Sequence, residues 1–362
     1  MIFFENLNLV NAPYLDLFNR SFLKTVEEDS FILGNQLLLF EDEFAKYVGA
    51  NHCIGVGSGL DALILPLLAW DFPKGSEVIV PANTYFATIL AVIQAGLQPV
   101  LVDPDIETYL LNAKIIEKYI TKQTRAILPV HLYGKPCNIG ELKELADLYN
   151  LKLLEDCAQA HGARYLNQTT GSNSDAGSFS FYPTKILGAL GDGGAITCNE
   201  EELANKLRAL RNSGSNLKYK FQYLGINSKL DTIQAGFLRV KLSDLNNKIQ
   251  ERRKLASLYS TNLLDHVIKP VHDKSSYDVY HIYNIRHPER DKLRKYLFDN
   301  GVQTEIHYPI PPYLQPSIKG KLKKIHFPAS DEIHSTTLSL PLSYAHTTDD
   351  VLKVVELVND FV

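Results

Sequence analysis

The stretch SFSFYPTKILGALGDGGAI (residues 178–196) holds a single lysine, Lys185, between an aromatic, hydroxyl-rich run and a cluster of glycines. Ser180, Tyr182 and Thr184 precede the lysine. Two interpretations fit this pattern. The first is a strand that ends in a glycine-rich turn with a solvated lysine. The second is an amine that is held beside an anion so that it can react with an electrophile. The rest of the chain decides between them.

Residues 52–211 alternate between short apolar runs and helix-like segments. The runs predict buried strands at 52–57, 77–81, 98–103, 125–131, 151–156, 178–182 and 195–198. The segments between them predict helices at 60–70, 86–96, 112–122, 139–149 and 201–211. Strands that alternate with helices form mostly parallel sheets that are covered on both faces. We therefore expect an α/β fold, with a mostly parallel seven-stranded sheet in a large domain over residues 1–240.

The pattern changes near residue 230. Residues 230–264 predict one long, charged, amphipathic helix of the kind that connects two domains. Beyond it, apolar and polar residues alternate with period two at 279–286 and 302–307, which predicts strands. Helices are expected at 289–300 and 347–361. A proline-rich rigid loop is expected at 307–316. These features predict a smaller α+β C-terminal domain over residues 241–362.

The composition is that of an ordinary globular protein. The chain has 362 residues, of which 45% are hydrophobic and 22% are charged. Its net charge of −4 gives no global field for nucleic acid or an anionic membrane, and no apolar run is long enough to span a bilayer. Four scattered cysteines without a CxxC pair argue against a metal site or a disulfide framework. The apolar N-terminus lacks a basic segment, so we expect a cytoplasmic protein.

Ligands of open α/β sheets bind at the carboxyl ends of the strands. The stretch GVGSGLDAL (55–63) follows the first strand and opens a helix, where free N–H groups favour a phosphate; a tight turn without a ligand is the alternative. Gly57-x-Gly59-x-x-Ala62 loosely fits a dinucleotide fingerprint. The next strand ends in VIVPANTY without the carboxylate that a nicotinamide dinucleotide needs, so we disfavour that cofactor.

A cluster of polar residues follows another predicted strand in LLEDCAQAHGA (153–163). A carboxylate at such a place needs a partner to offset its desolvation. Asp156 is therefore either a helix cap or the partner of a cationic ring nitrogen. We expect His161 to be a hydrogen-bonded structural residue. Tyr85, after the second strand, is either a core residue or a side chain that stacks on a flat ligand.

Together these pieces form a phosphate cradle, a stacking aromatic, a buried carboxylate and a lysine. Pyridoxal 5'-phosphate (PLP) requires that set, because its aldehyde forms an imine with a lysine and its ring nitrogen needs an acidic partner. Burial favours the neutral amine that the imine requires.

The sequence resembles the DegT/DnrJ/EryC1/StrS family of PLP-dependent sugar aminotransferases, a branch of the type I PLP-dependent aminotransferase fold. The likeness covers nearly the whole chain and rests on FILGNQLLLFEDEFAKYVGANHCIGVGSGLDAL, EVIVPANTYFATILAVIQAGLQPVLVD, TRAILPVHLYGKP, LLEDCAQAHGA, GSFSFYPTKILGALGDGGAI, LGINSKLDTIQAGFL and YHIYNIR. The order of these motifs is more specific than any one of them.

The resemblance implies a catalytic lysine, Lys185, which binds the cofactor aldehyde as an imine. It implies cofactor contacts by Asp156 (ring nitrogen), Gln159 (phenolic oxygen), Tyr85 (stacking), Ser58, Gly59, Leu60 and Ser180 (phosphate) and, from the neighbouring subunit, Asn227 (phosphate). A homodimer with active sites at the interface is therefore expected. Two positions depart from the family pattern. Leu60 replaces a common Thr, so only the backbone of residue 60 can contact the phosphate. Lys229 replaces a common Arg, and a lysine cannot reproduce the planar geometry of the guanidinium group.

The resemblance also implies two half-reactions. L-Glutamate first gives its amine to the cofactor, leaving pyridoxamine 5'-phosphate, and a nucleotide-linked keto-deoxysugar then takes the amine. GLDAL, GINSKLD and HYPIPPYLQ favour the branch that aminates C-3 of dTDP-3-keto-6-deoxyhexoses, as for surface glycans such as O-antigens and S-layer glycans, and a C-4 aminotransferase is the alternative. The candidate substrate-binding residues are Tyr182, Lys218, Lys220, His307 and Tyr308, with Arg211 as a further cation near the diphosphate. For the three cations, the competing interpretation is a solvated loop, and for His307 and Tyr308 it is a packed loop. A non-catalytic PLP-binding regulator remains the competing function.

Overall fold

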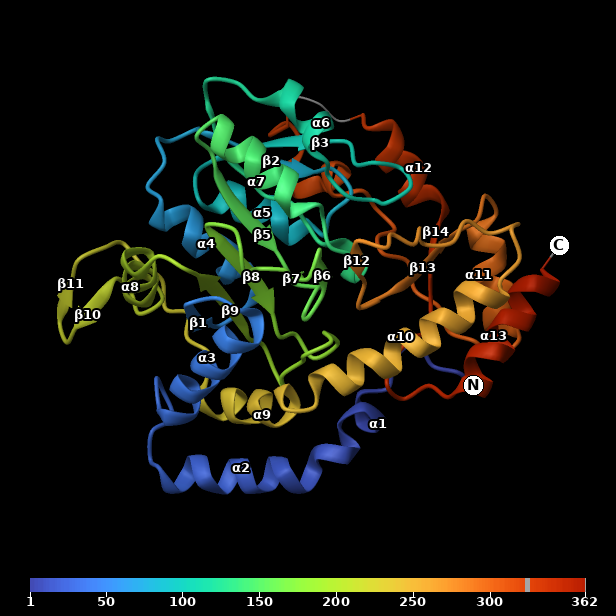
Figure 1. The fold of residues 1–362 in the computed structure, drawn as a ribbon, viewed down its shortest axis with the longest axis horizontal. Helices are drawn as coiled ribbons and strands as arrows, with labels where there is room; N and C mark the ends of the chain where they lie inside the picture. Colours follow the sequence, from blue (N-terminus) through green and yellow to red (C-terminus); the bar gives the residue numbers. More distant parts are fainter. Residues whose placement is uncertain (323–325, 362) are drawn as a thin grey trace.

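The computed structural model describes residues 1–322 and 326–361 (Figure 1). Its centre is a seven-stranded sheet in the order β1-β9-β8-β5-β4-β2-β3. The strands are β1 (His52–Val56), β2 (Glu77–Pro81), β3 (Gln98–Val102), β4 (Thr124–Ile127), β5 (Lys152–Asp156), β8 (Ala176–Ser180) and β9 (Gly194–Cys198). β9 is antiparallel to both of its neighbours, and the other pairs are parallel. The predicted mostly parallel sheet is therefore confirmed, and each predicted strand is present.

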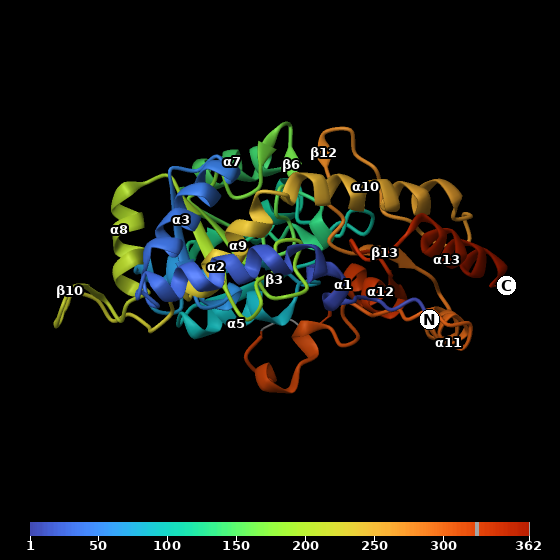
Figure 2. The same cartoon turned by 90° about the horizontal axis from the view of Figure 1, so that it is seen from below.

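Helices cover both faces of this sheet. α4 (Gly59–Ala69) and α5 (Phe86–Gln94) cover one face, with α8 (Glu201–Leu210) packed beside α4, whereas α7 (Ile139–Leu148) lies on the opposite side of the sheet from α5 (Figure 2). A second core includes Phe40 and Phe44 of α3 (Asn35–Val48), which pack on Phe179 and Phe181. The helix predicted at 112–122 is shorter than expected, because α6 (Ala113–Ile116) passes into a 3-10 turn, Glu117–Tyr119.

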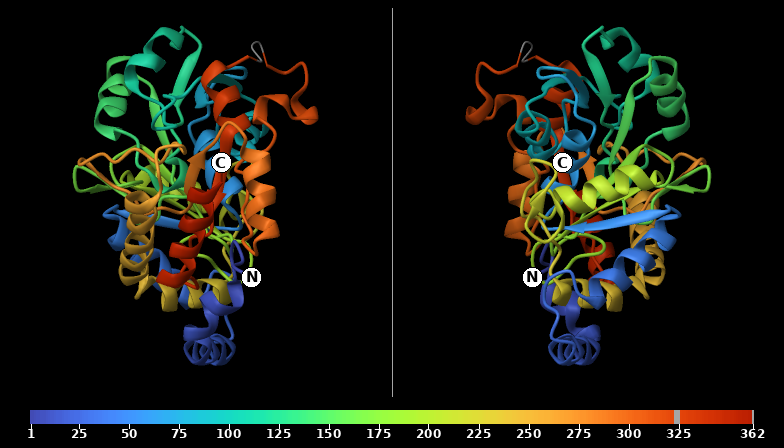
Figure 3. Two further views of the ribbon diagram at one scale, coloured as in Figure 1. Left: turned by 90° about the vertical axis from the view of Figure 1, so that its right-hand side faces the viewer. Right: turned by 90° about the vertical axis from the view of Figure 1, so that its left-hand side faces the viewer.

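The N-terminal segment forms helices that the sequence analysis did not anticipate. They are α1 (Leu7–Asn11), a 3-10 turn (Ala12–Tyr14) and α2 (Leu15–Glu27). α2 lies along α9 (Thr232–Leu242) as an outer layer of the molecule (Figures 1 and 3). The contact between them buries Tyr14, Phe18 and Phe237.

The single helix predicted over 230–264 is two helices, α9 and α10 (Leu245–Asn262). Asp244 interrupts them with φ −109° and ψ 0°, outside the helical region. Its carboxylate accepts a hydrogen bond from Tyr14 Oη at 2.8 Å, which holds the break against the N-terminal segment. The prediction of one continuous helix was therefore wrong.

The C-terminal part has its own core. β13 (Tyr283–Arg286) pairs antiparallel with β14 (Thr337–Leu340), and α11 (Arg290–Asp299) and α13 (Thr348–Asp360) pack with them. α12 (Pro328–Thr336) instead contributes Ile333 to the core of the large sheet. α10 contributes Ile249 to a core of the large sheet and Tyr259 to this C-terminal core, which Ile2 also joins. The boundary at residue 240 stays a prediction.

Residues 302–307, for which we expected strand character, make only isolated bridges, Ile2–Val302 and Glu305–Ser339, within the described chain. The strand that pairs with β13 is instead β14, which the alternation did not reveal. The proline-rich segment forms the expected loop, with 3-10 turns at Pro312–Leu314 and Pro316–Ile318, and it projects from the body of the molecule in Figure 2.

Smaller elements complete the structure. β6 (Arg164–Tyr165), β7 (Gln168–Thr169) and β12 (Ser276–Tyr277) form one small sheet, and a 3-10 turn, Leu132–Gly134, follows β4. β10 (Ser215–Leu217) and β11 (Lys220–Phe221) form a hairpin that extends away from the rest of the molecule (Figures 1 and 2). Within the described residues, every helix is too short or too polar to cross a bilayer.

Candidate active site

The loop that carries Lys185 follows the carboxyl end of β8. The loop folds back on itself, because the Lys185 N–H donates to the Tyr182 carbonyl at 2.8 Å and the Ala189 N–H donates to the Phe181 carbonyl at 2.8 Å. Lys185 is half-buried in this folded loop, and the desolvation of its amine argues against the freely solvated lysine of the first interpretation.

The environment of Lys185 favours a neutral amine. Burial lowers the pKa of Lys185 to about 8, and the negative charge of Asp156 partly opposes that shift. A lysine with a lowered pKa in a strand-end site is a candidate nucleophile or base.

Asp156 is the last residue of β5 and is 5% exposed. Its register partner on β8 is Ser178, so its side chain lies at the same sheet edge as the loop of Lys185. Thr88 Oγ1 of α5 donates to Asp156 Oδ2 at 2.9 Å, and the Ala158 N–H donates to Oδ1 at 3.1 Å. Burial raises the pKa of Asp156, and these two hydrogen bonds and the charge of Lys185 oppose that shift. The carboxylate retains lone pairs for a further donor.

The neighbouring residue, Glu155, faces away from Asp156 because successive side chains of a strand alternate. Its carboxylate contacts His131 Nε2 at 2.8 Å and accepts from Ser174 Oγ at 2.6 Å. The Cys137 N–H donates to His131 Nδ1 at 2.9 Å, so Nε2 carries the proton in that contact. His131, Glu155 and Cys157 place possible ligand atoms within 4.8 Å of one another. Burial raises the pKa of Cys157 to about 12, and the cluster is a hydrogen-bonded support behind Asp156.

Gln159 joins three segments of the site. The Tyr133 N–H donates to Gln159 Oε1 at 2.6 Å, which leaves Nε2 to donate to Tyr308 Oη at 2.9 Å. The ring of Tyr308 in turn lies 5.3 Å from the ring of Tyr85, centroid to centroid. Tyr85 is 56% exposed, so it is not the core residue that one interpretation expected. The amide of Gln159 is thereby oriented with its donor toward the site.

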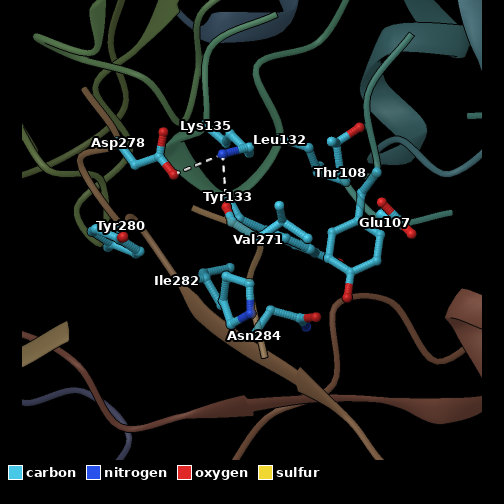
Figure 4. Close-up of a pocket in the computed structure, with 12 residues that line it drawn as sticks. Glu107, Thr108, Leu132, Tyr133, Lys135, Val271, Asp278, Tyr280, Ile282 and Asn284 are labelled. Atoms are coloured by element: carbon cyan, nitrogen blue, oxygen red, sulfur yellow. Dashed lines mark hydrogen bonds and ion pairs between the residues drawn. The ribbon is translucent and has the colours of Figure 1, made fainter. Parts of the chain in front are cut away.

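Tyr133 holds Gln159 from an unusual backbone conformation, with φ 59° and ψ 9°. Its hydroxyl donates to the His307 carbonyl, which links the strand-end loops to the C-terminal part. A small cavity lies beside this residue (Figure 4), and it is bordered by the buried ion pair of Lys135 with Asp278 at 3.0 Å. Tyr133 is therefore fixed on both sides, which rigidifies the position of Gln159.

The N-terminus of α4 provides an anion site. Ser58 caps the helix by accepting from the Asp61 N–H at 3.1 Å, and the first N–H groups, of Gly59 and Leu60, point out of the helix end. A Cβ on Gly59 would lie 2.5 Å from Ser180 Cβ, so only glycine allows Ser180 to approach this closely. The Leu60 side chain packs on the core, so its backbone N–H is what remains for a phosphate.

Histidines next to Lys185 are neutral. Burial lowers the pKa of His307 to about 4 and that of His161 to about 3, and the charge of Lys185 adds to both shifts. His307 Nδ1 lies 2.9 Å from Ser339 Oγ. A hydrogen bond with the Ser180 backbone partly opposes the lowering of the pKa of His161, although within the described residues neither ring nitrogen has a partner of ideal geometry. His161 is thus a buried structural residue, as expected. Its ring packs on Phe179 and Phe181.

Several expected substrate contacts lie apart from Lys185 in this chain. Lys218 and Lys220 are exposed on the projecting hairpin, and Lys218 lies over the ring of Tyr219 at 5.3 Å. Tyr182 is in the loop of Lys185 but is 53% exposed. Arg211 was wrongly expected near a diphosphate, because it is 5% exposed and ion-paired with Glu41.

Asn227 is exposed beside the α4 end of its own chain. It lines a shallow cavity with Gly57 and Asp61, and its side-chain oxygen accepts from Lys229. Lys229 therefore already contacts an amide, and the expectation that Asn227 reaches a phosphate of the neighbouring subunit stays a prediction.

These residues fit pyridoxal phosphate. The amine of Lys185 has a lowered pKa, Asp156 is a buried carboxylate with spare lone pairs, and Gly59 and Ser180 close a cradle at a helix N-terminus. Gln159 presents a donor toward the same space. Each of these groups matches one part of the cofactor: aldehyde, ring nitrogen, phosphate and phenolic oxygen.

Sequence reasoning missed Thr88 and Tyr133, although both lie in motifs that it singled out. Thr84 Oγ1 and Thr88 Oγ1 are 2.7 Å apart; Thr84 precedes the N-cap of α5, and Thr88, four residues later, lies in the first turn of that helix. This four-residue spacing close to the end of a predicted strand could have indicated that Thr88 is near the site. For Tyr133 only the following glycine hinted at an unusual turn.

Comparisons with known proteins extend the geometry. The chain matches the model of the DegT/DnrJ/EryC1/StrS aminotransferase family over residues 16–359. It is 46% identical to dTDP-3-amino-3,6-dideoxy-alpha-D-galactopyranose transaminase from Aneurinibacillus thermoaerophilus, across 100% of this chain and 99% of the relative. Other relatives that cover most of the chain are dTDP-3-amino-3,4,6-trideoxy-alpha-D-glucose transaminases.

Solved structures give the same result. DesV from S. venezuelae, in complex with a ketimine intermediate, superposes with a TM-score of 0.96 at 38% identity, over 100% of this chain and 98% of that chain. NtdA from Bacillus subtilis, with bound cofactor PMP, superposes with a TM-score of 0.88 at 30% identity, over 96% and 83%. The expected fold class and cofactor are confirmed. The chain belongs to the DegT/DnrJ/EryC1/StrS family of PLP-dependent aminotransferases.

Proposed function

We propose that this aminotransferase converts a dTDP-linked 3-keto-6-deoxyhexose into its 3-amino-3,6-dideoxy product, with L-glutamate as amino donor. The main observation in support of this chemistry is that Lys185, whose pKa is lowered to about 8, follows β8, and that the buried Asp156 ends the neighbouring strand β5. The 46% identity to a dTDP-3-amino-3,6-dideoxygalactose transaminase, over the full chain, supports the substrate class and the C-3 position. We infer that the amino sugar serves glycan synthesis.

In this proposal Lys185 is the catalytic base and acid. PLP, when bound, supplies an aldehyde and an electron-accepting ring. Lys185 Nζ would take the proton from Cα of the amino donor, hold it and release it again within the site, which requires an amine that loses its own proton more readily than an ordinary lysine does. Asp156 holds the proton of the ring nitrogen, and Thr88 and the Ala158 N–H keep the carboxylate charged.

The remaining roles follow from position. Ser180, Ser58 and the backbone N–H groups of Gly59 and Leu60 bind the phosphate. Gln159 donates to the phenolic oxygen, and Tyr85 stacks on the ring. For the sugar, Tyr182, His307 and Tyr308 line the approach to Lys185, where burial keeps His307 neutral and able to accept a hydrogen bond.

The hairpin lysines and Asn227 require a second subunit. Lys218 and Lys220 project away from their own chain, so they meet a diphosphate only across an interface, and we assign Asn227 to the phosphate of the partner site. A homodimer also explains the apolar outer face of α2. The residues Leu15, Phe22 and Val26 share that face by their spacing and are 58%, 44% and 45% exposed.

We assign the protein to the cytoplasm. Its four cysteines are buried free thiols, as expected for a chain that folds in a reducing compartment.

One experiment tests the central assignment. The purified protein is loaded with PLP, treated with borohydride and digested, and the modified lysine is mapped by mass spectrometry. We expect the adduct on Lys185, and Lys185→Ala should lose transamination of the 3-keto sugar with L-glutamate while still binding pyridoxamine phosphate. The control Lys46→Ala removes a lysine that is 74% exposed and should keep full activity. An adduct on another lysine, or an active Lys185→Ala enzyme, would disprove the role of Lys185; a C-4 amino product would disprove the regiochemistry alone.

A further inference from the structure

The loop behind Lys185 is held from outside by polar side chains that the reaction itself does not use. Two carbonyls of this loop, those of Ile186 and Gly188, turn away from the site. Lys241 Nζ donates to the Gly188 carbonyl at 2.6 Å, and Tyr344 Oη donates to the Ile186 carbonyl at 3.1 Å.

The loop tolerates little rearrangement at these points. A Cβ on Gly188 would lie 2.3 Å from the Pro183 carbonyl oxygen, so the chain passes very close to itself there. Two residues later, the Leu190 N–H donates to Gln234 Oε1 at 2.9 Å. Three side chains, those of Tyr344, Lys241 and Gln234, therefore each hydrogen-bond to one outward backbone group of this loop.

Two of these side chains come from one helix face. Gln234 and Lys241 are seven residues apart on α9, which is two helical turns, so they point to the same side. Tyr344 comes from the C-terminal part, where Arg252 of α10 lies over its ring at 5.3 Å. The loop of Lys185 is therefore braced by α9 and by the segment that follows β14.

Lys241 is an unexpected residue at its place. It is 5% exposed, and its two acceptors, the Gly188 carbonyl and Asn11 Oδ1 at 3.2 Å, are both uncharged. Within the described residues it has no carboxylate at ion-pair distance. Burial lowers its pKa to about 8, and the more distant charge of Glu5 opposes that shift. A buried ammonium without a counter-ion is destabilising, so its presence points to a role other than stability.

We propose that Lys241, Gln234 and Tyr344 are positioning residues that fix the loop of Lys185, with Lys241 as the principal anchor. The proposal rests on the assignment of Lys185 as the reacting amine. Without the anchor, the loop opens and water reaches the amine. The charge of Lys241 is retained because a charged donor holds a carbonyl more firmly than a neutral one.

The test uses Lys241→Met, which keeps the length of the side chain and removes the donor. Hydrogen–deuterium exchange of the cofactor-free protein is measured for residues 182–190, where we expect exchange to rise about tenfold for the loss of one strong hydrogen bond. The pH at which Lys185 is half-labelled by acetic anhydride should rise, because the amine becomes hydrated. The melting temperature should stay equal or increase.

Lys269→Met is the matched control. Lys269 also donates to a backbone carbonyl, that of Leu263 at 2.9 Å, but outside this loop. The control should change neither readout at residues 182–190. Tyr344→Phe removes one hydroxyl only and should give a smaller change in the same direction. If Lys241→Met does not fold, Tyr344→Phe and Gln234→Ala carry the test.

Unchanged exchange and an unchanged labelling midpoint in these variants would overturn the proposal. A merely structural role would lower the melting temperature and raise exchange throughout the molecule, which would also overturn it. Failure of the active-site assignment is a separate result, because the borohydride adduct would then map to another lysine while the exchange data remain interpretable.

Discussion

The titration of Lys185 can be measured directly in the cofactor-free protein. Burial lowers its pKa to about 8 from an ordinary 10.5. At pH 7 about one-tenth of the amine is then neutral, which is roughly 300-fold more than for an ordinary lysine. Competitive labelling with acetic anhydride, followed by mass spectrometry, gives the midpoint for Lys185 against the exposed Lys46 in the same sample.

Asp156→Asn is the informative perturbation, because it keeps the shape and removes the charge. That charge opposes the effect of burial on Lys185. Its removal should therefore lower the labelling midpoint further, by about one pKa unit, the low end of the range for an opposite charge nearby. The neutral fraction of Lys185 at pH 7 would rise to about one-half.

The control is Asp175→Asn, which removes a carboxylate that pairs with Lys152 at 2.8 Å. It should leave the midpoint of Lys185 unchanged. A wild-type midpoint at or above 10 would refute the argument from burial. A midpoint that rises, or does not move, in Asp156→Asn would refute the coupling between the two groups.

Three further changes test other parts of the site. Thr88→Val removes a hydrogen bond to Asp156 that is worth about 1.5–3 kcal/mol, so the pKa of Asp156 should rise and PLP should bind about tenfold more weakly in an absorbance titration. Gly59→Ala places a Cβ 2.5 Å from Ser180 Cβ, so it should destabilise the protein by about 1–3 kcal/mol in urea and weaken binding of PLP more than of unphosphorylated pyridoxal. Lys185→Met removes a group whose folded pKa, about 8, lies below its unfolded value of 10.5, so stability should rise more steeply between pH 8 and 10.5 in the wild type than in the variant. Lys241, whose pKa is also lowered to about 8, contributes equally to both proteins. The difference in unfolding free energy between the two proteins should shrink by about 2.6 kcal/mol across that window; equal slopes would contradict the lowered pKa.

The strand positions could be predicted because each strand is an apolar run bounded by turn residues. In a parallel sheet the carboxyl ends lie at one edge, so Asp156 and Ser180 could be expected together, and the register of β5 on β8 confirms that neighbourhood. Local pattern could also place Gly59 at a helix start.

Contacts between distant segments could not be predicted in the same way. The bond between Gln159 and Tyr308 joins residues that are 149 positions apart. It depends on how the C-terminal part is seated against the sheet, which no local pattern specifies. The break at Asp244 was hidden for a similar reason, since its partner Tyr14 lies 230 positions away. Helix propensity alone favoured a continuous helix there.

Lys185 and Lys241 show how closely function and destabilisation are linked in this fold. Burial lowers the pKa of each to about 8, so below that pH the cofactor-free protein holds two poorly solvated ammonium groups. The first must lose its charge to react, whereas the second must keep its charge to hold the loop firmly. A local sequence pattern cannot distinguish these roles, because both residues appear as isolated lysines. The distinction depends on the surroundings of each amine: the charge of the Asp156 carboxylate acts on Lys185, whereas Lys241 donates to a backbone carbonyl.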